Sequence, residues 1–162
     1  NTRVVRRTEA LLTERQKSYG NNFTYQEHAF HKSWSKALFS TLGLGLLGLT
    51  LVSPLRKIVR SFLRKPGEGP SVEVQENGWF ECKYLVECED GQKSLYKING
   101  KGDPGYKLTA QFASESALCL LIDKDKLPGG QEYGGILTTA SGMGEALIFR
   151  LRNSGIGFEK IW

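Results

Sequence analysis

Residues 79–99, WFECKYLVECEDGQKSLYKIN, decide the fold class of this chain. Hydrophobic side chains at Phe80 and at every second position after it alternate with mostly charged ones, as on a strand with one buried face. The sequence Glu89-Asp90-Gly91 is typical of a hairpin turn, and residues 93–99 return as the partner strand. The stretch therefore predicts a β-hairpin.

Two helices and a last strand follow the hairpin. The hydrophobic spacing predicts helices over residues 106–123 and 141–153, with Gly155 near the C-terminal cap of the second, and a closing strand over 156–162. The inward-facing helical residues are expected to be Leu108, Phe112, Cys119, Ile122, Met143, Leu147, Ile148 and Leu151. This order of strands and helices predicts an α+β fold with an antiparallel or mixed sheet and packed helices.

The chain before residue 37 is predicted to belong to the same α+β domain. Residues 2–17 have the pattern of a helix, and the alternation over residues 23–30 predicts a short strand. The first turns of the helix carry Arg3, Arg6 and Arg7, which the helix dipole disfavours. They indicate either an external acidic partner or no function at all.

Composition limits the class of protein. A chain of 162 residues with 40% hydrophobic residues can form one domain with a buried core. Its net charge of +5 is modest, and basic residues are not interleaved with aromatic ones, which argues against nucleic-acid binding. Cys82, Cys88 and Cys119 have no paired spacing, so we expect reduced, packed thiols. Because the chain starts with Asn1 and shows no secretory signal pattern, we expect it to begin partway through a longer protein.

An uncharged stretch occupies residues 37–55, between Lys36 and Arg56. Its length falls within the roughly 17–25 residues that span a hydrocarbon core. It contains Gly43, Gly45 and Gly48, and glycine is more frequent in membrane helices than in soluble ones. The alternative is a buried core helix.

A basic amphipathic helix is predicted directly after this stretch, with Ser53-Pro54 as its cap and first residue. Hydrophobic and basic side chains would lie on opposite faces, as in helices that bind anionic lipid. The predicted membrane-binding residues are Leu44, Leu47, Leu51, Leu55, Arg56, Lys57, Ile58, Val59, Arg60, Phe62, Leu63, Arg64 and Lys65. Residues 37–65 are thus predicted to associate with a membrane, 66–70 to form a linker, and 71–162 to form the C-terminal α+β domain.

Residues 100–105 match the Gly-x-Gly-x-x-Gly pattern of dinucleotide-binding loops, but the chemistry argues against that use. Pro104 has no N–H for a phosphate, and Asp103 adds a negative charge where the phosphate would lie. We expect no cofactor or metal site in this chain, since His28 and His31 have no cysteine nearby. The best polar cluster is Asp103, Tyr106 and Glu115, which could line a substrate pocket or serve only as a turn cap and an exposed carboxylate.

Several segments resemble saccharopine dehydrogenase-like oxidoreductases. The run NTRVVRRT at residues 1–8 is similar to a segment of that family. The further similar segments are residues 69–71, 103–106, 114–120, 134–139 and 155–158, in the same order and spacing. The resemblance covers nearly the whole chain, and it matches only the C-terminal part of such proteins.

The resemblance implies a preceding Rossmann domain that holds NAD(P), and a likeness to enoyl reductases of glycolipid synthesis. It also implies a location at a mitochondrial membrane or a lipid droplet. The chain would then be the membrane-associated, substrate-side part of a lipid-related oxidoreductase, with a Rossmann domain in cis or in trans as its partner. The alternative is a non-catalytic accessory subunit of a membrane protein complex.

Overall fold

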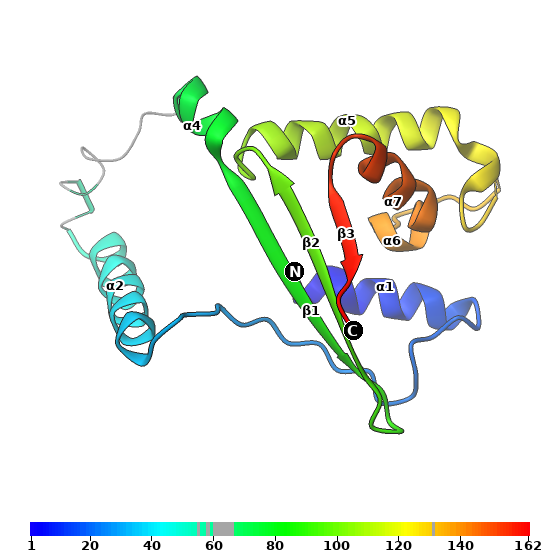
Figure 1. The fold of residues 1–162 in the computed structure, drawn as a ribbon, viewed down its shortest axis with the longest axis horizontal. Helices are drawn as coiled ribbons and strands as arrows, with labels where there is room; N and C mark the ends of the chain where they lie inside the picture. Colours follow the sequence, from blue (N-terminus) through cyan, green and yellow to red (C-terminus); the bar gives the residue numbers. More distant parts are fainter. Residues whose placement is uncertain (55, 58, 60–66, 131) are drawn as a thin grey trace. The chain divides into compact units, whose positions relative to one another are not determined.

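The computed structural model describes residues 1–54, 56–57, 59, 67–130 and 132–162 (Figure 1). The chain divides into two compact units. The first unit combines Asn1–Tyr25 with Pro70–Trp162, and the second is Gln26–Gly69. Each unit is described by itself below.

A three-stranded antiparallel sheet forms the centre of the first unit, in the order β1-β2-β3 (Figure 1). Strand β1 is Trp79–Glu87, β2 is Lys93–Lys101 and β3 is Gly157–Lys160. The hairpin between β1 and β2 pairs Tyr84 with Tyr96, and its turn places Gly91 at a φ of 81°, a conformation that glycine adopts without strain. The predicted α+β class and hairpin are confirmed.

Four helical segments connect β2 to β3: α5 (Lys107–Ile122), the short 3₁₀ helix η1 (Lys124–Lys126), α6 (Thr139–Gly142) and α7 (Gly144–Asn153). The single helix predicted over 141–153 is wrong. Gly144 has a φ of 50°, outside the helical region, and its left-handed conformation separates α6 from α7. After α7, Gly155 ends the helix in a Schellman motif, with Ile156 N–H donating to the carbonyl oxygen of Leu151.

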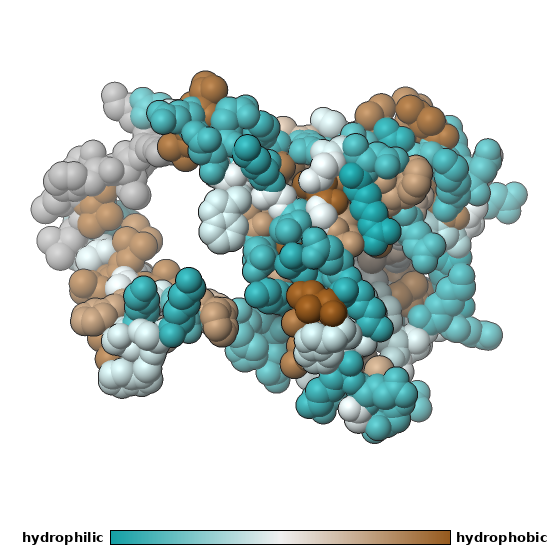
Figure 2. Space-filling model, in the orientation of Figure 1, coloured by the Kyte–Doolittle hydropathy of each residue, from teal (hydrophilic) through white to brown (hydrophobic). Residues whose placement is uncertain are grey.

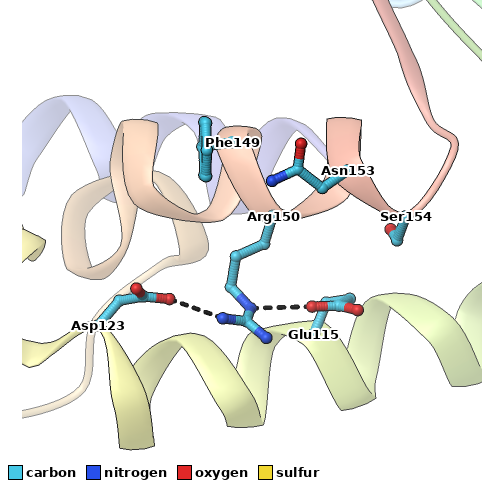
Figure 3. A pocket seen from close by; sticks show the side chains of 6 residues that line it. All are labelled: Glu115, Asp123, Phe149, Arg150, Asn153 and Ser154. Carbon is cyan, nitrogen blue, oxygen red and sulfur yellow. Dashed lines mark hydrogen bonds and ion pairs between the residues drawn. The ribbon is translucent and has the colours of Figure 1, made fainter.

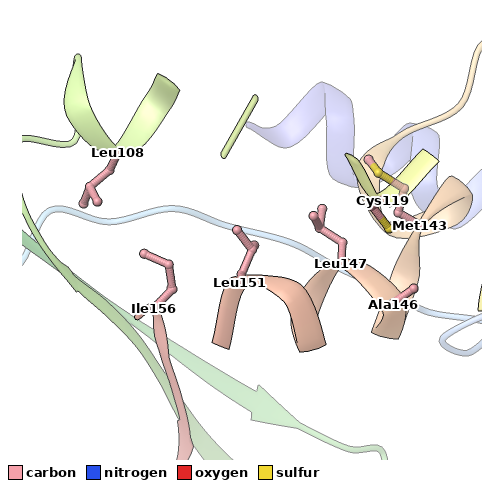
Figure 4. Packing of buried hydrophobic residues seen from close by; sticks show 7 residues of the cluster. All are labelled: Leu108, Cys119, Met143, Ala146, Leu147, Leu151 and Ile156. Atoms are coloured by element: carbon pink, nitrogen blue, oxygen red, sulfur yellow. The ribbon is translucent and has the colours of Figure 1, made fainter. Parts of the chain in front are cut away.

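The core lies between α5, α7 and one face of the sheet (Figure 4). Its buried residues are Leu108, Cys119, Met143, Ala146, Leu147, Leu151 and Ile156. Phe80, Ile98, Phe112, Leu127 and Phe158 are partly buried against them. Two predicted inward-facing residues are exposed, Ile122 at 64% and Ile148 at 37%.

Helices α1 (Thr2–Glu14) and α4 (Val72–Asn77) complete the first unit. Helix α1 contacts α6, and α4, which the sequence pattern did not indicate, begins at Ser71 with a hydrogen bond from Val74 N–H to the Ser71 hydroxyl. The predicted strand over residues 23–30 is wrong, because residues 23–31 form neither a helix nor a strand. An alternating pattern produces a strand only where another strand pairs with it.

The second unit contains α2 (Trp34–Val52), which begins at Ser33, where the hydroxyl accepts a hydrogen bond from Lys36 N–H. Its hydrophobic side chains are exposed, as the brown and tan side chains over α2 show in Figure 2. Ser53, predicted to begin a helix, ends α2 by donating its N–H to the Leu49 carbonyl, and its own carbonyl accepts a hydrogen bond from Arg56 N–H, the first of the described helical residues after it. In the helix predicted after it, Leu55, Ile58, Arg60, Phe62, Leu63, Arg64 and Lys65 lie outside the described residues.

Candidate functional site

Arg150 bridges two carboxylates between α5 and α7 (Figure 3). Its Nε lies 2.8 Å from Glu115 Oε2, and its Nη1 lies 2.8 Å from Asp123 Oδ2. Asp123 is the residue at which α5 ends, and its other oxygen accepts a hydrogen bond from Lys126 Nζ at 2.9 Å. The four side chains form an ion-pair network that fixes the end of α5 to α7.

The network stabilises the charged form of its members. The hydrogen bond from Lys126, followed by that from Arg150, holds the pKa of Asp123 below its usual range. Hydrogen bonds to Asp123 and Glu115 raise the pKa of Arg150. Arg150 therefore stays protonated at neutral pH, with its charge balanced by the two carboxylates that it contacts.

A shallow cleft of about 310 Å³ opens beside this network. Its lining residues are Glu115, Asp123, Phe149, Arg150, Asn153 and Ser154 (Figure 3). Arg150 and Lys126 balance the two carboxylates, so the network offers no unpaired positive charge to a phosphate or carboxylate. The side chains that line the cleft are those of a structural contact between two helices.

The predicted cluster of Asp103, Tyr106 and Glu115 is divided in the structure. Asp103 Oδ2 accepts a hydrogen bond from Tyr106 N–H at 2.7 Å, in the turn that leads into α5. Glu115 lies nine residues after Tyr106, about 13 Å further along the helix at 1.5 Å per residue. Asp103 and Tyr106 therefore shape the start of α5, Glu115 belongs to the Arg150 network, and a substrate pocket made by the three stays a prediction.

The loop at residues 100–105 does not fit a dinucleotide. Gly102 N–H donates to the Gly78 carbonyl at 2.6 Å, and Asp103 N–H donates to the Gln75 carbonyl at 2.8 Å. These two N–H groups are thus occupied by the chain itself, whereas a phosphate-binding loop directs such groups at its ligand. The loop serves to join β2 to α5 and to hold it against α4.

The remaining reactive side chains form no metal site among the described residues. His28 Nε2 lies 3.3 Å from Gln26 Oε1. The expectation of packed thiols is wrong for Cys82 and Cys88, which are exposed, while Cys119 is buried. Burial raises the pKa of the Cys119 thiol, which makes it a poor nucleophile at neutral pH.

Sequence reasoning missed a chain of hydroxyl groups that joins α1 to α6. Thr8 Oγ1 lies 2.7 Å from Thr138 Oγ1, which lies 3.0 Å from Ser141 Oγ. Thr8 and Ser141 are buried, and Thr138 and Ser141 form a capping box at the start of α6. The spacing of Thr138 and Ser141, three residues apart before a hydrophobic run, is the signal that could have indicated the cap.

Arg15 makes a second contact between α1 and the loop before α6, also missed. Its Nη2 donates to the Pro128 carbonyl at 2.5 Å, and its guanidinium lies 4.3 Å from the centre of the Tyr133 ring. Together with the hydroxyl chain, this contact positions the segment before α6, residues 127–130 and 132–138, against α1; it is called here the glycine-rich loop.

Comparison with known proteins identifies relatives named for one activity. A trans-acting enoyl reductase of Mycobacterium leprae is 34% identical over 164 residues, which cover 96% of this chain and 38% of the relative. The trans-acting enoyl reductase of Mycobacterium ulcerans is 32% identical over 164 residues, with the same coverage. A Mycobacterium tuberculosis protein, provisionally named the same way, is 34% identical over 167 residues, or 98% of this chain. No family model and no solved structure matches the chain significantly.

These findings correct the predicted family. Relatives over nearly the whole chain are named trans-acting enoyl reductases, so assignment to a saccharopine dehydrogenase-like oxidoreductase is wrong, and so is the alternative of an accessory subunit in a membrane complex. Their names give no support to a membrane or lipid-droplet location. The chain is similar along nearly its whole length to trans-acting enoyl reductases, of which it spans 38%.

Proposed function

We propose that this chain forms part of an enoyl reductase that acts in trans. The observation that carries the proposal is 34% identity over 98% of the chain to relatives of that name. An enoyl reductase saturates a carbon–carbon double bond conjugated to a carbonyl, by adding a hydride at the β carbon and a proton at the α carbon. Acting in trans means that another polypeptide presents the enoyl chain.

The hydride for this reaction is proposed to come from NAD(P)H, the usual hydride donor of reductases. The loop at residues 100–105 is unsuited to hold it, because its Gly102 and Asp103 N–H groups bond to Gly78 and Gln75. We therefore propose that the nicotinamide cofactor binds to a part of the longer enzyme outside these 162 residues. This chain would contribute a folded α+β unit to that enzyme.

A spectrophotometric assay tests the proposal. The full-length protein that contains this chain is mixed with NADPH or NADH and with crotonyl-N-acetylcysteamine, a small neutral enoyl thioester. We expect cofactor oxidation that depends on the enoyl thioester and is absent with the saturated butyryl thioester. The proposal fails if the full-length folded protein oxidises neither cofactor in the presence of the enoyl thioester.

We also propose that α2 binds the enzyme to a lipid surface, and the observation behind it is the exposure of the helix. Helix α2 has 19 residues and is long and hydrophobic enough to cross a membrane. None of its hydrophobic stretch is buried within the structure. Lys36 and Arg56 flank its uncharged stretch. A buried core helix, the alternative reading, would not leave Leu44, Leu47 and Leu49 exposed.

Vesicle binding tests this second proposal. Leu44→Arg with Leu47→Arg would place two charges in the apolar stretch, each costing about 2.5–3.5 kcal/mol at a bilayer centre. We expect at least a tenfold loss of partitioning onto phosphatidylcholine–phosphatidylserine vesicles. Leu85→Arg with Leu121→Arg, at exposed leucines of β1 and α5, adds the same charge as the matched control and should not lower partitioning. Equal partitioning of all variants would refute the role of α2.

A further inference from the structure

Three arginines on α1 have few partners in the part of the chain that the structure describes. Arg3 and Arg6 are one turn apart, and Arg7 lies four residues after Arg3, so the three side chains are neighbours on the helix surface. Across the described residues, Arg3 and Arg6 make no hydrogen bond or ion pair. Arg7 makes one long hydrogen bond, from Nη2 to the Ile136 carbonyl at 3.4 Å. Within the described residues, the charges of Arg3 and Arg6 therefore have no counterpart.

An exposed hydrophobic side chain lies beside these arginines. Ile136 is 88% exposed, in the glycine-rich loop before α6, and its own carbonyl accepts the Arg7 hydrogen bond. Val4, next to Arg3 on α1, is 53% exposed. Arginine beside exposed hydrophobic side chains is typical of protein-binding surfaces, in which arginine is enriched.

The two segments of this surface are held together by the contacts described above. The hydroxyl groups of Thr8 and Thr138 lie 2.7 Å apart, and Arg15 donates to the Pro128 carbonyl at the start of the same loop. Arg3, Arg6, Arg7 and Ile136 therefore form one positioned surface, called here the α1 docking surface. A fixed surface loses little conformational entropy on binding.

We propose that the α1 docking surface binds the acidic protein that carries the enoyl chain as a thioester. The inference rests on the proposed function, because an enzyme that acts in trans must contact the polypeptide that presents its substrate. Three guanidinium groups that are not paired with acidic side chains favour an acidic partner, because their charges are complementary. Hydrogen bonds between guanidinium and carboxylate groups are strong and directional. The exposed Ile136 supplies the apolar contact that charge alone lacks.

A pair of matched charge reversals tests the surface in the full-length protein. The test variant is Arg3→Glu with Arg6→Glu, which removes no contact within the described chain and places acidic residues at a helix start, where they are favoured. The control is Lys101→Glu with Lys124→Glu, two other exposed cations, which changes the net charge equally. The substrates are a crotonyl-loaded acyl carrier protein and crotonyl-N-acetylcysteamine.

With the carrier-bound substrate, we expect kcat/KM of the test variant to fall about tenfold or more at low salt, the size of effect that electrostatic steering produces. Added salt should shrink the difference, because salt screens exposed charges. The small neutral thioester should be reduced at the rate of the unmodified protein, and the control should behave like the unmodified protein on both substrates. An unchanged rate on the carrier-bound substrate, or equal losses on both substrates, would overturn the inference.

Direct binding separates this inference from the proposed function. Association of the carrier protein is measured by calorimetry with the unmodified protein and both double variants. If the unmodified protein binds the carrier and the test variant does not, the docking surface is supported. If no thioester is reduced in that case, only the proposed function fails. Reduction of the small thioester without any carrier binding would refute the docking surface and leave the proposed function standing.

Discussion

Among single residues, Arg150 on α7 forms ion pairs with two carboxylates, one within α5 and one at its end. It reaches both Glu115 and Asp123, and Lys126 neutralises the remaining oxygen of Asp123. Since the side chain of Asp123 is only 10% exposed, its charge is partly removed from water and depends on these partners. The network therefore links the ionisation of Asp123 to the packing of two helices.

Asp123→Asn should lower the free energy of unfolding at pH 7. The pKa of Asp123 is lowered in the folded chain by Lys126 and Arg150, so its contribution to stability is present above the unfolded pKa of about 4 and is lost as pH falls through the folded value. The difference between the two proteins should therefore shrink below about pH 4. Urea denaturation at pH 7 and at lower pH measures it, with Glu14→Gln as an exposed control. A difference that stays constant down to acid would contradict this role.

Thr8→Val should destabilise the chain by about 0.5–1.5 kcal/mol, because it removes the hydrogen bond between the hydroxyl groups of Thr8 and Thr138. Thr13→Val on the same helix is the matched control, since its hydroxyl is exposed and bonds within α1. Thermal unfolding of both variants gives the comparison. Equal midpoints for the two would show that the hydroxyl chain does not fasten α1 to α6.

The sequence anticipated the buried residues Leu108, Cys119, Leu147 and Leu151, because helical spacing marks the face that carries them. It placed Ile122 and Ile148 inside as well, and both are exposed. Spacing cannot tell which of two hydrophobic faces a helix buries, since that depends on what packs against it. Arg150 and its partners were also beyond prediction, because 27 residues separate Asp123 from Arg150.

At the scale of elements, α5 is hydrophobic on more than one side. Leu108 is 1% exposed and faces the core, whereas Leu121 on the same helix is 67% exposed.

Helices and strands were predicted from the sequence more successfully than contacts between single side chains. The hairpin, α5 and β3 each have a local pattern. The predicted strand over residues 23–30 lacked a partner, and α4 is too short to show a period.

Leu108→Ala should cost about 2–5 kcal/mol of unfolding free energy, because it leaves a cavity where α5 meets the sheet. Leu121→Ala, the same substitution at an exposed position of α5, should change it by less than about 0.5 kcal/mol. Urea denaturation of both variants checks the burial pattern of the helix. A larger loss from the Leu121 substitution would mean that α5 packs through its other face.

For the molecule as a whole, the proposed function rests on similarity to longer relatives, and the docking surface rests on how α1 and the glycine-rich loop are arranged. The chain spans 38% of the relatives it matches, so the activity in their names belongs to a longer protein. Within this chain, the α+β unit holds α1 and the glycine-rich loop in place, and α2 belongs to a separate unit. The dinucleotide pattern at residues 100–105 shows why a motif needs its context, because two of its N–H groups are already bonded within the chain.

The most direct test of enoyl reduction is the product itself. The full-length protein is incubated with NADPH and crotonyl-N-acetylcysteamine, and the thioester is then analysed by mass spectrometry. The account predicts conversion to the butyryl thioester, heavier by the mass of two hydrogens, with NADP⁺ formed in equal amount. Recovery of the crotonyl thioester unchanged, with folded enzyme and with either NADPH or NADH, would contradict it.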